Sequence, residues 1–160
     1  MPETEGASLM TMALAEAERA GARGEVPVGA VLVDGASGLL LAAAGNRVEE
    51  LCDPTAHAEV LVLRAAGKRL GTPRLPHCDL YVTLEPCALC ATAISFARIR
   101  RLYFGAYDPK GGGVEHGPRL YEHATIHHRP EVYGGIDESR AGLLLRRFFD
   151  QRRTSDSAQE

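Results

Sequence analysis

Two short stretches constrain the fold of this 160-residue chain most strongly: "HAE" at residues 57–59 and "PCALC" at residues 86–90. Each stands at the start of a segment rich in helix formers, and the strand-like run "DLYVTLE" lies between them. Cys thiolates and His nitrogens are the usual ligands of zinc in proteins. A fold in which His57, Cys87 and Cys90 act together must therefore bring two helix starts side by side.

The hydrophobic pattern predicts an alternation of helices and strands. Apolar residues recur at three- and four-residue intervals over residues 7–20, which predicts a helix, and two apolar runs in residues 26–45 flank a turn, which predicts a hairpin. The other predicted elements are a loop at 46–54, a helix at 57–71 capped by Thr55, a strand at 79–85, a helix at 86–99 opened by Pro86, a strand at 101–107, a loop at 108–118, a short strand at 124–129 or 131–133, and a helix at 137–153 capped by Asp137. This order predicts an α/β fold, a three-layer α/β/α sandwich with a central mixed five-stranded sheet, antiparallel at the hairpin and parallel where helices cross over.

Length and composition indicate one domain over residues 1–160, with a disordered tail from about residue 154. No apolar run approaches the roughly 20 residues that a membrane span needs, and the acidic N-terminal stretch lacks the basic start of a signal peptide. We therefore expect a cytoplasmic protein. Four cysteines are too few for a disulfide scaffold, and in a reducing compartment the C-x-x-C pair indicates metal binding or redox chemistry.

The distribution of charged residues is compatible with a nucleic-acid partner. A net charge of −3 argues against a protein that coats nucleic acid through its overall field. Arginines nevertheless gather at residues 98–101 and in the last helical segment, as Arg140, Arg146, Arg147, Arg152 and Arg153. A basic stripe on an acidic protein can still hold a short piece of nucleic acid. Phe148 follows the apolar face of Leu144 and is expected in the core, whereas Phe149 points elsewhere.

The candidate ligands indicate a catalytic rather than a structural metal site. His57, Cys87 and Cys90 supply three ligands and leave a fourth position free, which is the pattern of catalytic zinc. The two helix N-termini favour thiolate over thiol. Glu59 lies roughly 200° around a regular helix from His57 and is poorly placed as a second ligand. It can instead exchange protons with a water that zinc activates, which predicts hydrolytic chemistry.

Other interpretations of these residues stay open from residue types alone. The cluster fits a redox C-x-x-C or a structural zinc site that takes a fourth ligand from Cys52, Cys78 or His77. Glu85 is expected to be a structural carboxylate. The Gly111–Gly113 run lacks the lysine and spacing of a P-loop, which favours a flexible turn over a phosphate cradle.

The order H-x-E followed by P-C-x-x-C is the known signature of the zinc nucleobase deaminases. The longer blocks "EVPVGAVLV", "DPTAHAE", "LYVTLEPCALC", "ARIRRLYFGAYDPK" and "LLLRRFFDQRR" make the chain resemble the bacterial tRNA adenosine deaminases of the cytidine deaminase superfamily. The likeness extends from about residue 5 to residue 153. The chain departs from the family pattern at residues 127–129, which read His-His-Arg where many relatives have Asn-His-Arg.

This resemblance implies a zinc hydrolase that converts the wobble adenosine of a tRNA anticodon to inosine. It implies one Zn²⁺ per subunit on His57, Cys87 and Cys90, with Glu59 as the proton shuttle. It further implies substrate contacts from Asn46 to the base, from Asp108 near the target ribose, and from the terminal helix through Phe148, Phe149, Arg152 and Arg153. The family is homodimeric, with the helix after "PCALC" in the interface. The alternatives are a deaminase of a free nucleobase or nucleoside, of guanine or cytosine type, and a nonenzymatic zinc-stabilised module.

Overall fold

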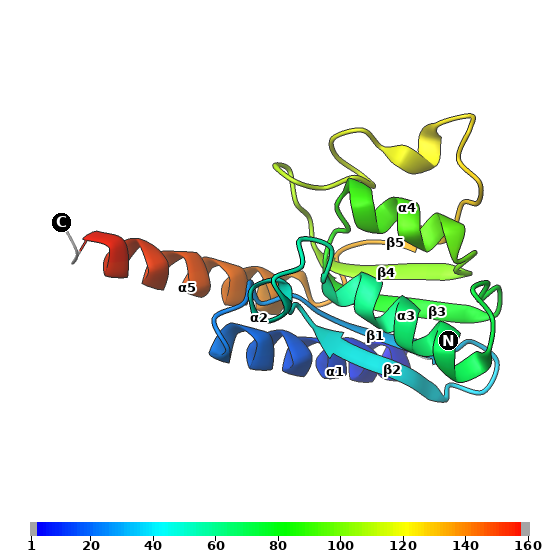
Figure 1. The fold of residues 1–160 in the computed structure, drawn as a ribbon, viewed down its shortest axis with the longest axis horizontal. Helices are drawn as coiled ribbons and strands as arrows, with labels where there is room; N and C mark the ends of the chain where they lie inside the picture. Colours follow the sequence, from blue (N-terminus) through cyan, green and yellow to red (C-terminus); the bar gives the residue numbers. More distant parts are fainter. Residues whose placement is uncertain (1–2, 158–160) are drawn as a thin grey trace.

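The apolar hairpin and two crossover segments build one mixed sheet. The computed structural model describes residues 3–157, and its strands lie in the order β2-β1-β3-β4-β5 (Figure 1). They are β1 (Gly29–Asp34), β2 (Leu40–Gly45), β3 (Cys78–Leu84), β4 (Arg101–Ala106) and β5 (Glu131–Tyr133). β1 pairs antiparallel with β2 and β3, whereas β4 pairs parallel with β3 and β5. The predicted mixed five-stranded sheet is confirmed.

Helices cover both faces of this sheet. α1 (Glu3–Ala22) and α5 (Glu138–Ser157) lie on one face, and α3 (Ala58–Leu70) and α4 (Ala88–Phe96) lie on the other. Alternate strand residues serve the two cores: Leu80 belongs to the core under α3 and α4, and its neighbour Tyr81 to the core under α1. The three-layer sandwich is therefore confirmed. Over residues 3–157, none of the helices combines the length and the apolar character that crossing a membrane requires.

The start of α3 differs from the prediction. His57, not Thr55, is its N-cap residue, and the helix begins at Ala58. Thr55 instead donates its hydroxyl and its backbone N–H to Oδ1 of Asp53, at 2.7 and 2.8 Å. The prediction was wrong because a neighbouring carboxylate competes for the groups that a cap would use.

α4 also begins two residues later than the sequence predicted. Its N-cap is Cys87 and its first residue is Ala88, so Pro86 precedes the helix instead of opening it. Both His57 and Cys87 thus occupy N-cap positions in extended backbone conformation. The free N–H groups of two helix starts therefore surround the candidate ligands.

Two connecting segments contain structure that the hydrophobic pattern does not reveal. The predicted loop at 46–54 includes the short helix α2 (Val48–Leu51), and the 3-10 helix η1 (Leu120–Glu122) follows the glycine-rich loop. The short fifth strand is β5 and not residues 124–129.

α5 continues beyond the point where we expected disorder to begin. It runs through Ser157, and residues 158–160 lie outside the described part of the chain. Thr154 and Ser155 donate their hydroxyls to the carbonyl oxygens of Asp150 and Gln151, and Arg153 pairs with Asp150 one turn earlier. The Arg153–Asp150 pair, three residues apart on one face of the helix, is of the kind that stabilises an exposed helix. In Figure 1 the C-terminal half of α5 projects away from the sheet.

Gly29 marks the closest approach of the sheet to α1. A Cβ at this position would lie 2.0 Å from the carbonyl oxygen of Ala13 and 2.5 Å from the nitrogen of Ala17. We expect Gly29→Ala to lower the free energy of unfolding by about 3 kcal/mol, because helix backbone cannot yield to an inserted methyl group. Urea denaturation measures this, with Gly6→Ala as the control because a Cβ there meets only the Tyr81 hydroxyl at 3.8 Å. Equal stabilities of the two variants would contradict the prediction.

Candidate metal centre and active site

The two helix starts meet at the carboxyl edge of the sheet. β2, β3 and β4 run in the same direction, and Asn46, Cys87 and Asp108 stand in the segments that follow their ends. His57 lies beside them at the start of α3. Ligand sites of α/β sheets occur at this edge because the loops after the strands converge there.

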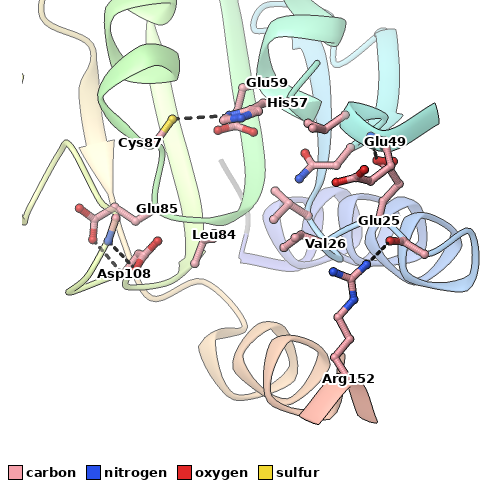
Figure 2. A pocket seen from close by; sticks show the side chains of 15 residues that line it. Glu25, Val26, Glu49, His57, Glu59, Leu84, Glu85, Cys87, Asp108 and Arg152 are labelled. Carbon is pink, nitrogen blue, oxygen red and sulfur yellow. Dashed lines mark hydrogen bonds between the residues drawn. The ribbon is translucent and has the colours of Figure 1, made fainter. Parts of the chain in front are cut away.

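His57, Cys87 and Cys90 bring three ligand atoms together, as the sequence predicted. Nδ1 of His57 lies 3.5 Å from Sγ of Cys87 (Figure 2) and 3.3 Å from Sγ of Cys90, and all three ligand atoms lie within 4.8 Å of one another. Ligand atoms of tetrahedral zinc, with bonds of about 2.0–2.3 Å, are separated by about 3.4–3.8 Å. The donor set and its spacing therefore fit Zn²⁺.

The cluster supplies three ligands and no fourth. Within residues 3–157, no other group of three or more His, Cys, Asp or Glu side chains could hold a metal. Cys52 and Cys78, which could have completed a structural site, lie outside the cluster, the first exposed and the second buried. A site with three protein ligands is the pattern of catalytic zinc, whose fourth position is taken by water or substrate.

The interactions within the cluster favour the thiolate form of Cys87. A hydrogen bond from Cys90 lowers the pKa of Cys87 to about 4 despite the burial of the thiol, and His57 adds to the effect. The same hydrogen bond, together with burial, raises the pKa of Cys90. The hydrogen bond to Cys87 raises the pKa of His57 against the effect of burial. Cys87 therefore favours the thiolate form and Cys90 the thiol form, and a bound cation would displace the thiol proton.

Glu59 lies in the first turn of α3 and lines the same cavity as His57 and Cys87. Its side chain is buried, with 4% of the residue exposed. Burial raises the pKa of its carboxyl, although its own backbone N–H and the Cys90 thiol oppose the shift. A carboxyl group with a raised pKa can both take up and release a proton near neutral pH.

Asn46 links the end of β2 to the start of α3. It is buried, and its Oδ1 accepts the backbone N–H of Ala58 at 2.8 Å. This bond satisfies one of the free N–H groups at the helix start and fixes the orientation of the amide. Asn46 lines the cavity, and Nδ2 is the donor that it offers to a ligand.

Glu85 is a buried carboxylate with many partners in the 108–116 segment. Burial would raise the pKa of Glu85, but hydrogen bonds from the backbone of Asp108 and from His116 outweigh it, so the pKa is lowered. A Cβ at Gly112 would lie 2.2 Å from Oε2 of Glu85, and one at Gly113 would lie 2.7 Å from the nitrogen of Ala88. The glycine run is therefore a tightly packed turn and not the flexible one that we expected.

These groups surround a cavity of about 340 Å³, within the range of small-molecule sites. One wall of this cavity, formed by Glu25 and α2, was not predicted from the sequence. Glu25, 2% exposed, accepts the backbone N–H groups of Glu49 and Glu50 and so caps α2, whose residues line the cavity (Figure 2). The available signal was an acidic residue directly before an apolar strand, in "EVPVG".

The cavity continues into a groove of about 900 Å³ under α5. The residues that line both spaces are Val26, Leu84, Asp108, Gly111 and Arg152. α5 contributes Arg146, Phe149, Arg152 and Arg153 to the groove. Asp108 and three of the four terminal-helix residues singled out in the sequence therefore lie together.

Phe148 does not reach the groove. It is buried, as its place on the apolar face predicts, whereas Phe149 is 45% exposed. Arg152 (Figure 2) donates to the carbonyl oxygen of Gly24 at 2.8 Å, and its guanidinium lies 4.5 Å above the Phe148 ring. Arg152 thus ties α5 to the rim of the cavity.

The other arginine cluster is occupied within the protein. Arg100 forms two hydrogen bonds with the buried carboxylate of Asp79, at 2.7 and 2.9 Å, and Arg101 pairs with Glu131 at 2.8 Å. Arg98 donates to the carbonyl oxygen of His127. Of the two arginine clusters, only the one on α5 contributes side chains to the groove beside the cavity.

The fold and the site together define a zinc-dependent deaminase. A profile of the cytidine and deoxycytidylate deaminase zinc-binding region matches residues 3–106, and the chain belongs to this family. Within it, the chain is 58% identical to the tRNA-specific adenosine deaminase of Agrobacterium fabrum, over 92% of this chain and 95% of that protein. It is 44% identical to the tRNA-specific adenosine deaminase of Aquifex aeolicus, over 91% and 95%.

Solved structures agree with this placement. One, from a study of A-to-I editing by tRNA:A34 deaminases at the wobble position of transfer RNA, superimposes with a TM-score of 0.84 at 58% identity, over 86% of this chain and 99% of the other. A guanine deaminase from Nitrosomonas europaea superimposes with a TM-score of 0.73 at 26% identity, over 92% and 84%. The two branches of the family thus share this fold.

Proposed function

We propose that this chain deaminates adenosine to inosine at the wobble position of a tRNA anticodon. The observation that carries the proposal is the continuity of the metal cavity with the groove under α5, which carries arginines and an exposed Phe149. Relatives that are 58% and 44% identical over more than nine tenths of this chain are tRNA-specific adenosine deaminases. A free-base deaminase has less support, because the guanine deaminase from Nitrosomonas europaea is 26% identical and that from Bacillus subtilis, at 38% identity, covers 62% of this chain.

Different side chains of the site have different roles in the proposed reaction. Zn²⁺ on His57, Cys87 and Cys90 would lower the pKa of a water molecule and supply a nucleophile at neutral pH. The new bond joins the water oxygen to C6 of adenine, and the bond that breaks releases the 6-amino group as ammonia. Glu59 takes the proton of the water and passes it to the departing nitrogen.

The remaining residues of the site hold the nucleotide. Asn46 donates to the base from the cavity wall, and Asp108 contacts the ribose where the cavity meets the groove. Phe149 stacks on a neighbouring base, and Arg152 and Arg153 neutralise phosphates, as aromatic and basic groups do in single-stranded RNA sites. Phe148 supports the RNA surface from below, because Arg152 packs on its ring.

The substrate is tested by incubating the zinc-loaded protein separately with an anticodon stem-loop that contains a wobble adenosine, with adenosine, with guanine and with cytosine. We expect inosine in the stem-loop and no ammonia from the three small molecules. Ammonia from a free base alone would overturn the proposal and assign the protein to the free-base branch.

Charge reversal in the groove is expected to weaken RNA binding. We predict that the double variant Arg146→Glu, Arg153→Glu lowers kcat/KM for the stem-loop more than tenfold and makes it less dependent on salt, because phosphate contacts are lost. The matched control is Arg19→Glu, Arg74→Glu, which reverses two exposed arginines that line neither space. Initial rates at several salt concentrations compare the two, and equal rates would contradict the role of α5.

We also propose that the protein is a cytoplasmic homodimer that associates through α3 and α4. Leu89 and Phe96 of α4 are 43% and 57% exposed, and an open cavity lies between the two helices. Exposed apolar side chains of this kind mark interaction sites. Sedimentation analysis of Phe96→Glu is expected to give monomers, and an unchanged species would exclude this interface. The cytoplasmic location follows from the proposed tRNA substrate.

A further inference from the structure

One carboxylate organises the whole 108–116 segment. Glu85 follows β3, comes two residues before the ligand Cys87, and has a fully buried side chain. Its Oε1 accepts the N–H of Asp108 at 3.1 Å and contacts Nδ1 of His116 at 2.8 Å. Its Oε2 accepts backbone N–H groups at 3.3, 3.0 and 3.1 Å from Val114, Glu115 and His116. These five contacts exceed the roughly four lone-pair sites of a carboxylate, so no acceptor site is left for another partner.

The same segment is packed against the start of α4. The N–H of Gly113 donates to the carbonyl oxygen of Pro86 at 2.8 Å, and Gly112 leaves no space for a side chain above Glu85. Oδ1 of Asp108 in turn accepts the N–H groups of Lys110 and Gly111, at 3.2 and 2.9 Å. Asp108 and the turn after it therefore form one hydrogen-bonded wall, and Glu85 sets its distance from the metal ligands.

We propose that Glu85 is a positioning residue that holds this wall, and Asp108 with it, at the place where the substrate enters the cavity. The inference rests on the proposed function, since the wall faces the nucleotide of the stem-loop. Glu85 lines the cavity, but its side chain is fully buried and its carboxylate contacts go to Asp108 and to residues 114–116, so it acts on the substrate through this segment. Its loss should therefore change substrate binding and leave the metal cluster intact.

The test compares Glu85→Gln with Asp79→Asn. Both replace a buried carboxylate of the β3 segment by its amide, but Asp79 lies at the far end of the strand and pairs with Arg100. For Glu85→Gln we expect normal zinc content, amide hydrogen exchange at residues 108–116 at least tenfold faster, and a KM for the stem-loop raised about tenfold with kcat within about threefold of wild type. Asp79→Asn should lower the melting temperature without a change in KM.

Several results would overturn the proposal. An unchanged KM for Glu85→Gln would make Glu85 merely structural, and loss of zinc would show that it supports the ligands instead of the wall. If Glu85→Gln does not fold, Gly112→Ala disturbs the same contact from the other side and should raise KM in the same way. If the wild-type protein does not act on the stem-loop, the proposed function fails, whereas the hydrogen exchange comparison still decides whether Glu85 holds the segment.

Discussion

Replacing Glu59 by Gln is expected to leave zinc in place and to lower kcat on the anticodon stem-loop by about 10³-fold, which corresponds to about 4 kcal/mol of activation free energy. Gln keeps the shape of the side chain but cannot carry a proton between the water and the departing ammonia. Glu59 is buried and lines the cavity beside His57 and Cys87, so bulk solvent cannot readily replace it. Inosine formation under single-turnover conditions measures the loss, and metal analysis establishes that zinc is retained.

The matched control for this prediction is Glu49→Gln. Glu49 lines the same cavity, but it is exposed and stands at the rim on α2. The control removes one negative charge from the cavity but keeps the buried carboxyl of Glu59. We therefore expect kcat of Glu49→Gln to fall by less than about tenfold. Near-normal turnover by the Glu59 variant, or equal losses in both variants, would remove Glu59 from the proton-transfer role.

The metal cluster could be predicted from the sequence because its signals are local. "HAE" and "PCALC" each place ligands at a helix start, and the strand between them sets the topology that joins the two starts. The same holds for Phe148 and Phe149, whose separation into core and surface follows from helical periodicity. In each case neighbours along the chain determine the environment.

The walls of the cavity could not be predicted in this way because they depend on contacts between distant segments. Glu25 caps a helix 24 residues further along the chain, and Glu85 collects the N–H groups of a segment 23 to 31 residues away. The glycines at 111–113 suggest flexibility in isolation, but close packing against Glu85 and Ala88 explains their small size. The start of α3 was missed for a different and local reason, because the backbone N–H and the hydroxyl of Thr55 donate to Asp53, two residues earlier.

Replacing Cys90 by Ala is expected to abolish both zinc binding and turnover. Cys90 is fully buried, its sulfur lies 3.3 Å from Nδ1 of His57, and no other His, Cys, Asp or Glu of residues 3–157 joins the cluster to replace it as a ligand. Two remaining ligands hold zinc far more weakly than three, and the zinc content of the purified protein should fall from about one per chain to near zero. The melting temperature should fall as well, because a metal that binds only the native state stabilises it.

The control for Cys90→Ala separates the loss of a metal ligand from the loss of core packing. Cys78 is also buried, 3% exposed, but it lies outside the cluster, so Cys78→Ala removes a comparable thiol and should keep both zinc and turnover. Zinc loss from Cys78→Ala as well would mean that the loss in Cys90→Ala reflects disturbed packing and not a missing ligand. Retention of zinc and turnover by Cys90→Ala would refute the three-ligand site itself.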